Sequence, residues 1–260
     1  MTAIHDSATM LRRNLRRMVR YPVAAAATIA VPVVFLLLFV FVFGDTMGAG
    51  LPAASGGRDE YLDYITPGII LISVAGAAQA AAISVSMDMT EGIINRFRTM
   101  SIARAAVLTG HVAGNLIQTL AAMIVVIALA LVLGFTPTAG PLEWLAVAGL
   151  LALISFAVIW LAVALGMVSK SVESASNLPM PLMLLPFLGS GFVPTDSMTG
   201  VLGWFAAHQP FTPMMDTLRG LLLGTVAGGD AALAVGWSVV IALTGYLWAR
   251  RLYDREPTTP

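Results

Sequence analysis

The sequence predicts an all-α integral membrane protein with six transmembrane helices, and three observations lead to this fold class. Of its 260 residues, 58% are hydrophobic and only 11% are charged, whereas a soluble domain carries about 25% charged residues. The apolar residues collect in stretches that approach or exceed the roughly 20 residues needed to cross a bilayer as a helix. The basic residues gather on alternate connections between these stretches, as they do in multi-pass membrane proteins.

The six apolar stretches define the expected spans, and Pro or Gly residues mark many of the breaks between them. The first stretch follows a basic cluster and lacks a small-residue cleavage site, so we expect a retained span rather than a signal peptide. We treat 1–260 as a single transmembrane domain. The expected spans are about 22–44, 64–87, 108–134, 142–168, 174–193 and 231–249.

Charge predicts the orientation of these spans. With six spans, all 14 basic residues except Arg58 and Arg219 fall on the side of the two termini. The positive-inside rule then places both termini in the cytosol. The opposite connection, 44–64, is rich in acidic residues, which agrees with an external position.

The residues before the first span have the pattern of an amphipathic helix. Leu11, Leu15 and Met18 share one face, and a set of arginines occupies another. We expect residues 1–21 to form an interfacial helix that ends at Pro22. The alternative is a charge cluster that orients the chain without a fixed structure. The arginines of the interfacial helix are Arg12, Arg13, Arg16, Arg17 and Arg20.

The connection between the second and third spans predicts a short cytosolic helix over about 89–104. Met89, Ile93 and Phe97 recur at helical spacing, while the charges fall largely on other faces. Such a helix has little to bury its apolar face against except lipid headgroups or another protein. A partner that acts on the membrane domain from the cytosol needs a surface of this kind.

The stretch 195–230 is apolar on average but is interrupted by Pro210, Pro213, Asp216 and Arg219. We expect a broken or re-entrant helical hairpin whose backbone is shielded by protein. Asp216 and Arg219 are three residues apart, so they can pair on one helical turn. The alternative is an external hairpin that never enters the hydrocarbon.

The polar residues within the spans are uncharged, and the fifth span combines methionines with prolines that would bend it. Such residues are candidates for a substrate path. Polar residues of this kind more often form interhelical hydrogen bonds, and an ordinary kinked helix explains the fifth span equally well. The candidates are Gln79, Asn115, Gln118, Asn177, Met180 and Met183.

The chain lacks the residues of an energy source. Ionisable groups are essentially absent from the interiors of the spans, which argues against ion coupling. The single lysine, Lys170, follows Ser169 rather than the glycine of a phosphate-binding loop, so ATP hydrolysis is excluded. No catalytic, cofactor or metal site is expected. An intramembrane protease using Ser190 and His208 is a minor alternative. Such enzymes have a glycine two residues before the nucleophilic serine, whereas this chain has Leu188 at that position.

Three segments together resemble the type-2 ATP-binding-cassette exporter permeases, in particular the daunorubicin-resistance membrane subunits. They are EGIINRFRTMSIARAAVLTG, ESASNLPMPLMLLPFLGSGFVP and HQPFTPMMDTLRGLLLG. The resemblance covers nearly the whole chain. Ser101 and Gln209 stand where the family usually has proline and asparagine, which leaves the subfamily open. In this family the second connection is the coupling helix, and the matching positions are Glu91, Gly92, Arg96, Phe97, Arg98, Ile102 and Arg104.

The resemblance implies a permease in a bacterial plasma membrane that exports an amphipathic drug, natural product or lipid-like compound. It also implies its partners: two copies of a cytosolic ATPase subunit, which bind the ATP and Mg, and a second permease copy or paralogue. No nucleic acid is expected. A polysaccharide or glycolipid exporter is the alternative, and it would be expected to line its path with aromatic residues, which make up only 8% of this chain.

Overall fold

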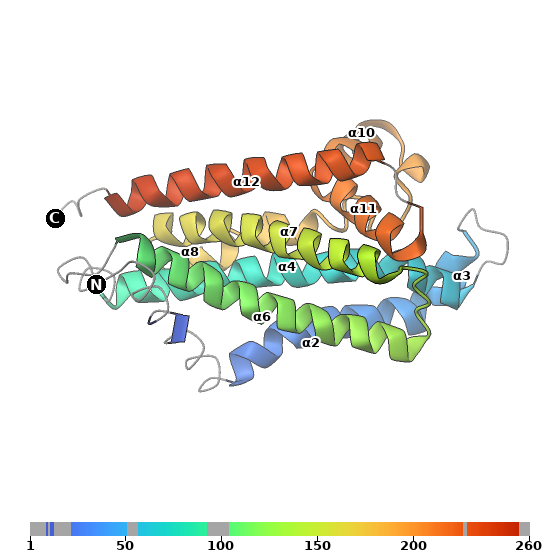
Figure 1. Cartoon of the computed structure of the whole chain (residues 1–260), viewed down its shortest axis with the longest axis horizontal. Coiled ribbons are helices and arrows are strands. Elements are labelled where there is room, and N and C mark those ends of the chain that lie inside the picture. The colour runs from blue at the N-terminus through green and yellow to red at the C-terminus, as the bar shows by residue number, and fades with distance from the viewer. Residues whose placement is uncertain are drawn as a thin grey trace.

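The computed structural model describes residues 9, 11–12, 22–50, 57–92, 104–225 and 228–254, which form an elongated helical bundle (Figure 1). Within these ranges there is no β-strand, so the all-α prediction is confirmed for the described part of the chain. The elements in order are α2 (Pro22–Leu38), the π-helical turn η1 (Phe39–Phe43), α3 (Gly44–Gly48), α4 (Arg58–Thr90), α6 (Arg104–Leu133), α7 (Pro141–Val168), α8 (Val172–Asn177), α9 (Met180–Leu184), the 3₁₀ turn η2 (Thr195–Ser197), α10 (Gly200–His208), α11 (Phe211–Leu223) and α12 (Gly228–Asp254).

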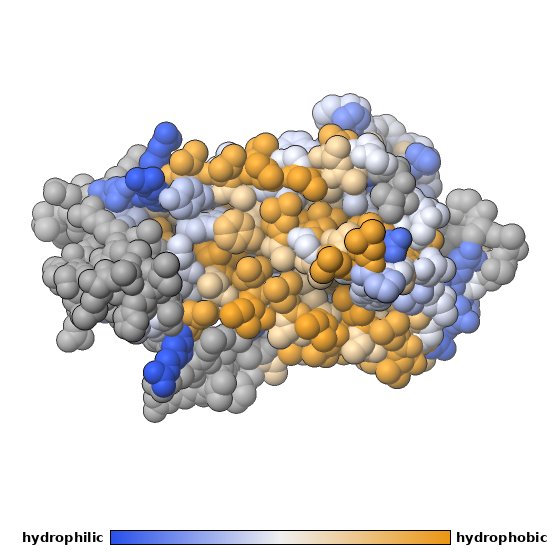
Figure 2. Space-filling view, in the orientation of Figure 1, coloured by the Kyte–Doolittle hydropathy of each residue, from blue (hydrophilic) through white to orange (hydrophobic). Residues whose placement is uncertain are grey.

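Five described helical stretches are long and apolar enough to cross a membrane. They agree with five of the predicted spans, and Figure 2 shows an apolar band across the middle of the molecule with hydrophilic residues toward both ends. This distribution is typical of a bilayer-embedded bundle. The five stretches are Thr28–Gly48, Arg58–Thr90, Leu108–Leu133, Pro141–Val168 and Gly228–Asp254.

The span expected over 174–193, which its prolines were expected to bend, is broken into short helices and turns. α8 ends at Asn177, α9 covers only Met180–Leu184, and turns follow as far as Gly191. The reason is the proline content, because Pro181 and Pro186 have no N–H to donate and their rings crowd the preceding helical turn. Apolar length alone therefore overestimated the helix here. We call residues 172–193 the broken segment.

The broken segment lies along α4 in the antiparallel direction. Near one end, Gln79 Nε2 donates to the carbonyl oxygen of Ser176 at 2.8 Å. Near the other, Gly68 approaches Gly191 so closely that a Cβ atom added to Gly68 would lie 2.7 Å from the Gly191 carbonyl oxygen. Positions 68 and 79 are about 16 Å apart along a helix axis, so the segment follows α4 over a large part of its length.

The two ends of the bundle differ in charge, and we name them accordingly. At the basic end α4 terminates, α6 begins and α12 finishes with Arg250 and Arg251 (Figure 1). At the acidic end α4 begins with Asp59, Glu60 and Asp63, and α10, α11 and the start of α12 lie nearby. The two polar ends of the bundle therefore differ in the sign of the charges that they carry.

α4 is the central helix. In its most apolar window 72% of the residues are buried, compared with 28% for α6 and 17% for α12. It contacts α2, α6, α7, α8, α9 and α11. Alanines such as Ala78, Ala81 and Ala82 are fully buried along it, and their small side chains let neighbouring backbones come close.

Glycines make the closest helix contacts. A Cβ atom at Gly166 of α7 would lie 2.5 Å from the carbonyl oxygen of Ala82 in α4. A Cβ atom at Gly245 of α12 would lie 2.6 Å from the backbone nitrogen of Leu161 in α7. The close packing of α7 against α4 and of α12 against α7 therefore depends on these glycines, because a side chain there would collide with the neighbouring backbone.

The stretch predicted as a hairpin forms two short helices, α10 and α11, at the acidic end. α11 is tightly packed: Phe211, Met214 and Leu218 are at most 1% exposed. It ends at Gly224, whose φ of 76° is the left-handed conformation that commonly terminates a helix.

The two predicted amphipathic helices fall mostly outside the described residues. Met89 and Thr90 of the expected 89–104 helix belong to α4, which is terminated by Gly92 with φ 70°. Arg104 begins α6, and residues 93–103 lie outside the description. Of the expected interfacial helix over 1–21, only residues 9, 11 and 12 are described.

Replacing Gly245 with alanine is expected to destabilise the bundle by about 1–3 kcal/mol, because the new methyl group forces α12 away from α7. The matched control is Gly236→Ala on the same helix, where an added Cβ meets nothing within 4 Å. That control should retain or gain stability, by up to about 1 kcal/mol, through the better helix propensity of alanine. Thermal unfolding in detergent measures both variants, and equal midpoints would contradict the close contact.

Candidate functional site

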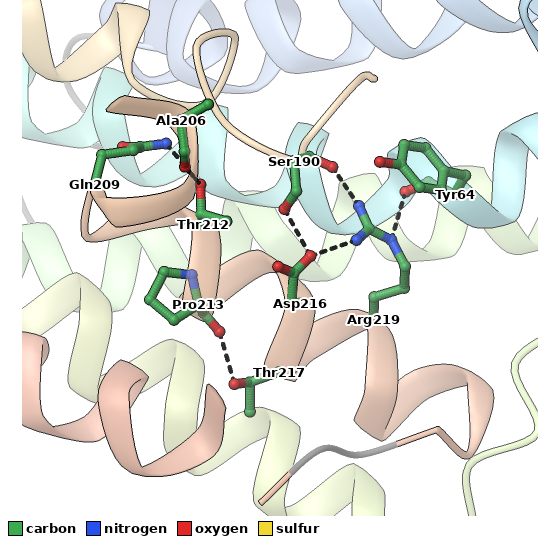
Figure 3. A network of polar contacts seen from close by, with 9 residues as sticks. All are labelled: Tyr64, Ser190, Ala206, Gln209, Thr212, Pro213, Asp216, Thr217 and Arg219. Carbon is green, nitrogen blue, oxygen red and sulfur yellow. Dashed lines mark hydrogen bonds and ion pairs between the residues drawn. The ribbon is translucent and has the colours of Figure 1, made fainter. Parts of the chain in front are cut away.

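A network of polar contacts joins α11 to α4 and to the broken segment at the acidic end, with Arg219 at its centre (Figure 3). Arg219 Nη1 donates to Asp216 Oδ1 at 2.6 Å, and Nη2 donates to the carbonyl oxygen of Ser190 at 2.6 Å. Its Nε donates to the carbonyl oxygen of Tyr64 at 3.3 Å, and its Cζ lies 4.0 Å from the centre of the Tyr64 ring. One guanidinium group therefore links α11, α4 and the broken segment.

Asp216 completes this network. Its Oδ1 accepts the Ser190 hydroxyl at 2.6 Å in addition to Arg219. The predicted pairing of Asp216 with Arg219 is confirmed, with the Arg219 side chain 15% exposed and that of Asp216 31% exposed. Hydrogen bonds to charged groups are stronger than neutral ones, so this small cluster fixes α11 firmly.

A second set of contacts holds the turn between α10 and α11. Gln209 Nε2 donates to the carbonyl oxygen of Leu185 in the broken segment at 3.0 Å and to Thr212 Oγ1 at 3.1 Å. Thr212 Oγ1 in turn donates to the carbonyl oxygen of Ala206 at 2.6 Å. Pro210 precedes α11 as its N-cap, and Pro213 lies in its first turn, where a missing N–H costs nothing. The Leu185 carbonyl oxygen also accepts the Leu188 N–H at 3.2 Å, so the hairpin side chain adds a second donor to it.

The network does not have the geometry of a protease. The Ser190 hydroxyl donates to a carboxylate rather than to a histidine. His208 Nδ1 lies 2.8 Å from the carbonyl oxygen of Trp204 in its own helix, and its ring stacks on Trp204 with centroids 4.8 Å apart. Both residues have other partners, so these contacts position helices instead of activating a nucleophile.

The candidate substrate-path residues do not converge on one cavity. Gln79 bonds to the broken segment, Asn115 Nδ2 donates to the carbonyl oxygen of His111 in its own helix at 2.9 Å, and Gln118 Nε2 donates to Thr28 Oγ1 of α2 at 3.2 Å. In the broken segment Asn177 and Met180 are exposed, and Met183 is partly buried. Gln79 and Gln118 therefore act as contacts between segments, whereas Asn115 bonds within its own helix.

An aromatic cluster between α2 and the broken segment was not anticipated from the sequence. The rings of Phe187 and Phe192 stack with centroids 4.7 Å apart, and Phe39 lies 4.6 Å from Phe192. Phe35 lies 5.4 Å from Phe187. An open pocket of about 420 Å³ begins beside Phe192, between α3 and residues 193–197. The four-residue spacing of phenylalanines at 35, 39 and 43 is the signal that one face of the first span would be aromatic.

A buried histidine–aspartate pair lies at the basic end. His111 Nε2 of α6 is 3.1 Å from Asp88 Oδ2 of α4, and the two side chains are 3% and 0% exposed. The Ser84 hydroxyl lies 3.5 Å from His111 Nδ1 on the other side of the ring. In the sequence, Asp88 and His111 lie at the ends of two different predicted spans. Their pairing was not predicted, because they are far apart along the chain.

The remaining predicted site residues are mostly outside the description. Glu91 and Gly92 form the turn that ends α4, and Arg104 starts α6. Arg12 is described as exposed and helical. The predicted residues outside the described ranges are Arg96, Phe97, Arg98 and Ile102 of the coupling helix, and Arg13, Arg16, Arg17 and Arg20 of the interfacial helix.

Comparison with known proteins gives one family and several relatives. Residues 6–223 match the family model described as ABC-2 type transporter. The daunorubicin resistance ABC transporter permease protein DrrB1 of Streptomyces coeruleorubidus is 27% identical over 257 residues, covering 98% of this chain and 88% of the relative. The probable doxorubicin resistance ABC transporter permease protein DrrC of Mycobacterium tuberculosis is 27% identical over 221 residues, covering 83% of this chain and 77% of the relative.

Replacing Arg219 with alanine is expected to cost about 2 kcal/mol of stability, because it leaves the partly buried Asp216 carboxylate with the Ser190 hydroxyl alone and removes the donors to two carbonyl oxygens. Thermal unfolding in detergent measures the loss. The double variant Asp216→Leu with Arg219→Met removes both charges and should recover much of it.

The control for this variant is Arg250→Ala. Arg250 pairs with Asp254 at 3.9 Å in an exposed position, so its loss should change stability by no more than about 0.5 kcal/mol. If Arg219→Ala were as mild as this control, the network would not hold α11 in place.

Proposed function

Because this chain belongs to the ABC-2 type transporter family, we propose that it is the membrane-spanning permease of an exporter that moves amphipathic compounds out of the cytosol. The observation that carries this proposal is the match of the family model over residues 6–223, which includes every described helix except α12. The drug-resistance permeases among its relatives support a drug, natural product or lipid-like substrate.

We propose that the basic end faces the cytosol and that the chain crosses the membrane six times. Five crossings are the long apolar helices. The sixth is the broken segment, which follows α4 from the region of Ser176 to that of Gly191. A non-helical backbone is tolerated at membrane depth where protein surrounds it, and Gln79, Gln209 and Arg219 supply donors to its carbonyl oxygens. α10 and α11 then form an external or re-entrant hairpin at the outer surface.

The energy source in this proposal is a separate ATPase subunit that binds ATP and Mg. Two copies of that subunit would dock at the basic ends of two permease chains, on the connection between α4 and α6. The supporting features are the basic residues of this connection and the charge difference between the two ends of the bundle. A second copy of this chain or a paralogue completes the transporter.

The aromatic cluster bears on the class of substrate. Phe35, Phe39, Phe187 and Phe192 offer ring faces without hydrogen-bonding groups. Such a surface suits an apolar or amphipathic molecule. A polysaccharide exporter is also expected to line its path with aromatic residues, so the cluster is compatible with both substrate classes. The polysaccharide exporter therefore remains the second candidate.

Reversing Arg96 and Arg98 to glutamate is expected to abolish co-purification of the ATPase subunit with the affinity-tagged permease, because the changes invert the charge of the proposed docking surface. Arg250→Glu with Arg251→Glu is the matched control, with the same charge change at the same end of the bundle. Mass spectrometry of the purified native complex identifies the partner. Equal recovery of an ATPase with both double variants would refute the docking site, and absence of any ATPase from the unmodified complex would refute the function.

The orientation is testable because the chain has no cysteine. Single variants Ser55→Cys, Ser197→Cys and Thr258→Cys are each treated with a membrane-impermeant maleimide in intact cells. Residues 55 and 197 should be labelled from outside, whereas residue 258 should be labelled only after the cells are opened. Labelling of residue 258 in intact cells would reverse the proposed topology.

A further inference from the structure

The buried pair at the basic end has a position that its stabilising role alone does not explain. Asp88 lies in the last turn of α4, which ends at Thr90, and His111 lies in the second turn of α6, which begins at Arg104. The pair therefore links α4 and α6 close to the two ends of the connection that is proposed to bind the ATPase. It joins two different helices, whereas Asp216–Arg219 and Arg250–Asp254 each lie within one helix.

The pair is costly to bury in an environment of low dielectric constant. Both side chains are almost completely shielded from solvent. A polar pair in such a place is weak evidence for stability, because the desolvation of the two groups offsets their attraction. Its directional bond, however, fixes the ends of α4 and α6 relative to each other.

Catalysis by the same residues is disfavoured by the helix around them. Ser84, His111 and Asp88 follow one another in the order of a catalytic triad. Ser84 lies in the interior of α4, where neighbouring backbone N–H groups are used in the helix and none is free to stabilise an oxyanion. The structure therefore favours a mechanical role.

α4 is suited to pass displacement from one end of the bundle to the other. It is continuous from Arg58 to Thr90 and is surrounded by other helices. Gln79 attaches its middle to the broken segment, and the carbonyl oxygen of Tyr64 attaches its outer part to Arg219 of α11. A movement imposed on its last turn therefore reaches the hairpin and the broken segment through direct contacts.

We infer that Asp88 and His111 are positioning residues that couple the ATPase to the transport path. They hold the ends of α4 and α6 as one unit, so that displacement of the connection between them moves α4 instead of bending its last turn. This inference rests on the proposed function. The pair binds neither substrate nor nucleotide and acts only through α4 and α6.

The experiment uses the purified permease with its co-purifying ATPase in proteoliposomes. It measures ATP hydrolysis and the transport of daunorubicin as the probe, and reports ATP consumed per molecule moved. Asp88→Asn and His111→Asn are compared with the exchanged variant Asp88→His with His111→Asp. The matched control is Asp63→Asn, in the same helix at the opposite end, where the side chain bonds only to exposed Thr136.

Asp88→Asn and His111→Asn should retain the ATPase subunit and hydrolyse ATP, but the ATP consumed per molecule moved should rise by about fivefold or more. The exchanged variant should bring the ratio back toward the unmodified value, and Asp63→Asn should leave it unchanged. An unchanged ratio in all variants would overturn the inference. A lower unfolding midpoint at an unchanged ratio would also overturn it, by showing a merely structural pair. If no ATPase subunit co-purifies with the unmodified permease, the proposed function fails instead.

Discussion

The enclosure of α4 is the constraint on which the rest of the structure depends. Where a neighbouring helix comes closest to an enclosed helix, only small side chains fit between the two backbones. The alanines along α4 and the glycine of α7 opposite Ala82 meet this requirement. Helices in lipid gain little from the hydrophobic effect when they associate, so close backbone contact and a few polar bonds must hold them. The bundle follows this rule, since its described interhelical polar contacts to α4 are few and are distributed from one end to the other.

The two charged clusters differ in what they restrain. At the acidic end, Arg219 binds carbonyl oxygens of two other segments, so it fixes backbone rather than a single side chain. At the basic end, Asp88 and His111 bind each other through their side chains. The guanidinium group of Arg219 therefore restrains the backbone of two segments at the outer end, whereas the Asp88–His111 pair fixes one helix end to another.

The sequence predicted most of the architecture because span length and charge asymmetry are properties of single segments. It failed at 172–193, where apolar content suggested a helix but Pro181 and Pro186 prevent one. The Asp216–Arg219 pair was predictable because the partners are one turn apart. Asp88 and His111 lie on different helices, and the phenylalanines of α2 meet those of the broken segment only after folding. Contacts of this kind need a packing arrangement that no single segment reveals.

The broken segment also sets an order of events during biosynthesis. The carbonyl oxygen of Ser190 accepts from Arg219, which is translated later. A nascent chain that has been made only as far as the broken segment lacks this donor, and an unsatisfied carbonyl group is costly in hydrocarbon. The long helices can therefore enter the bilayer as each is completed, but this segment can reach its final conformation only after α11 has left the ribosome.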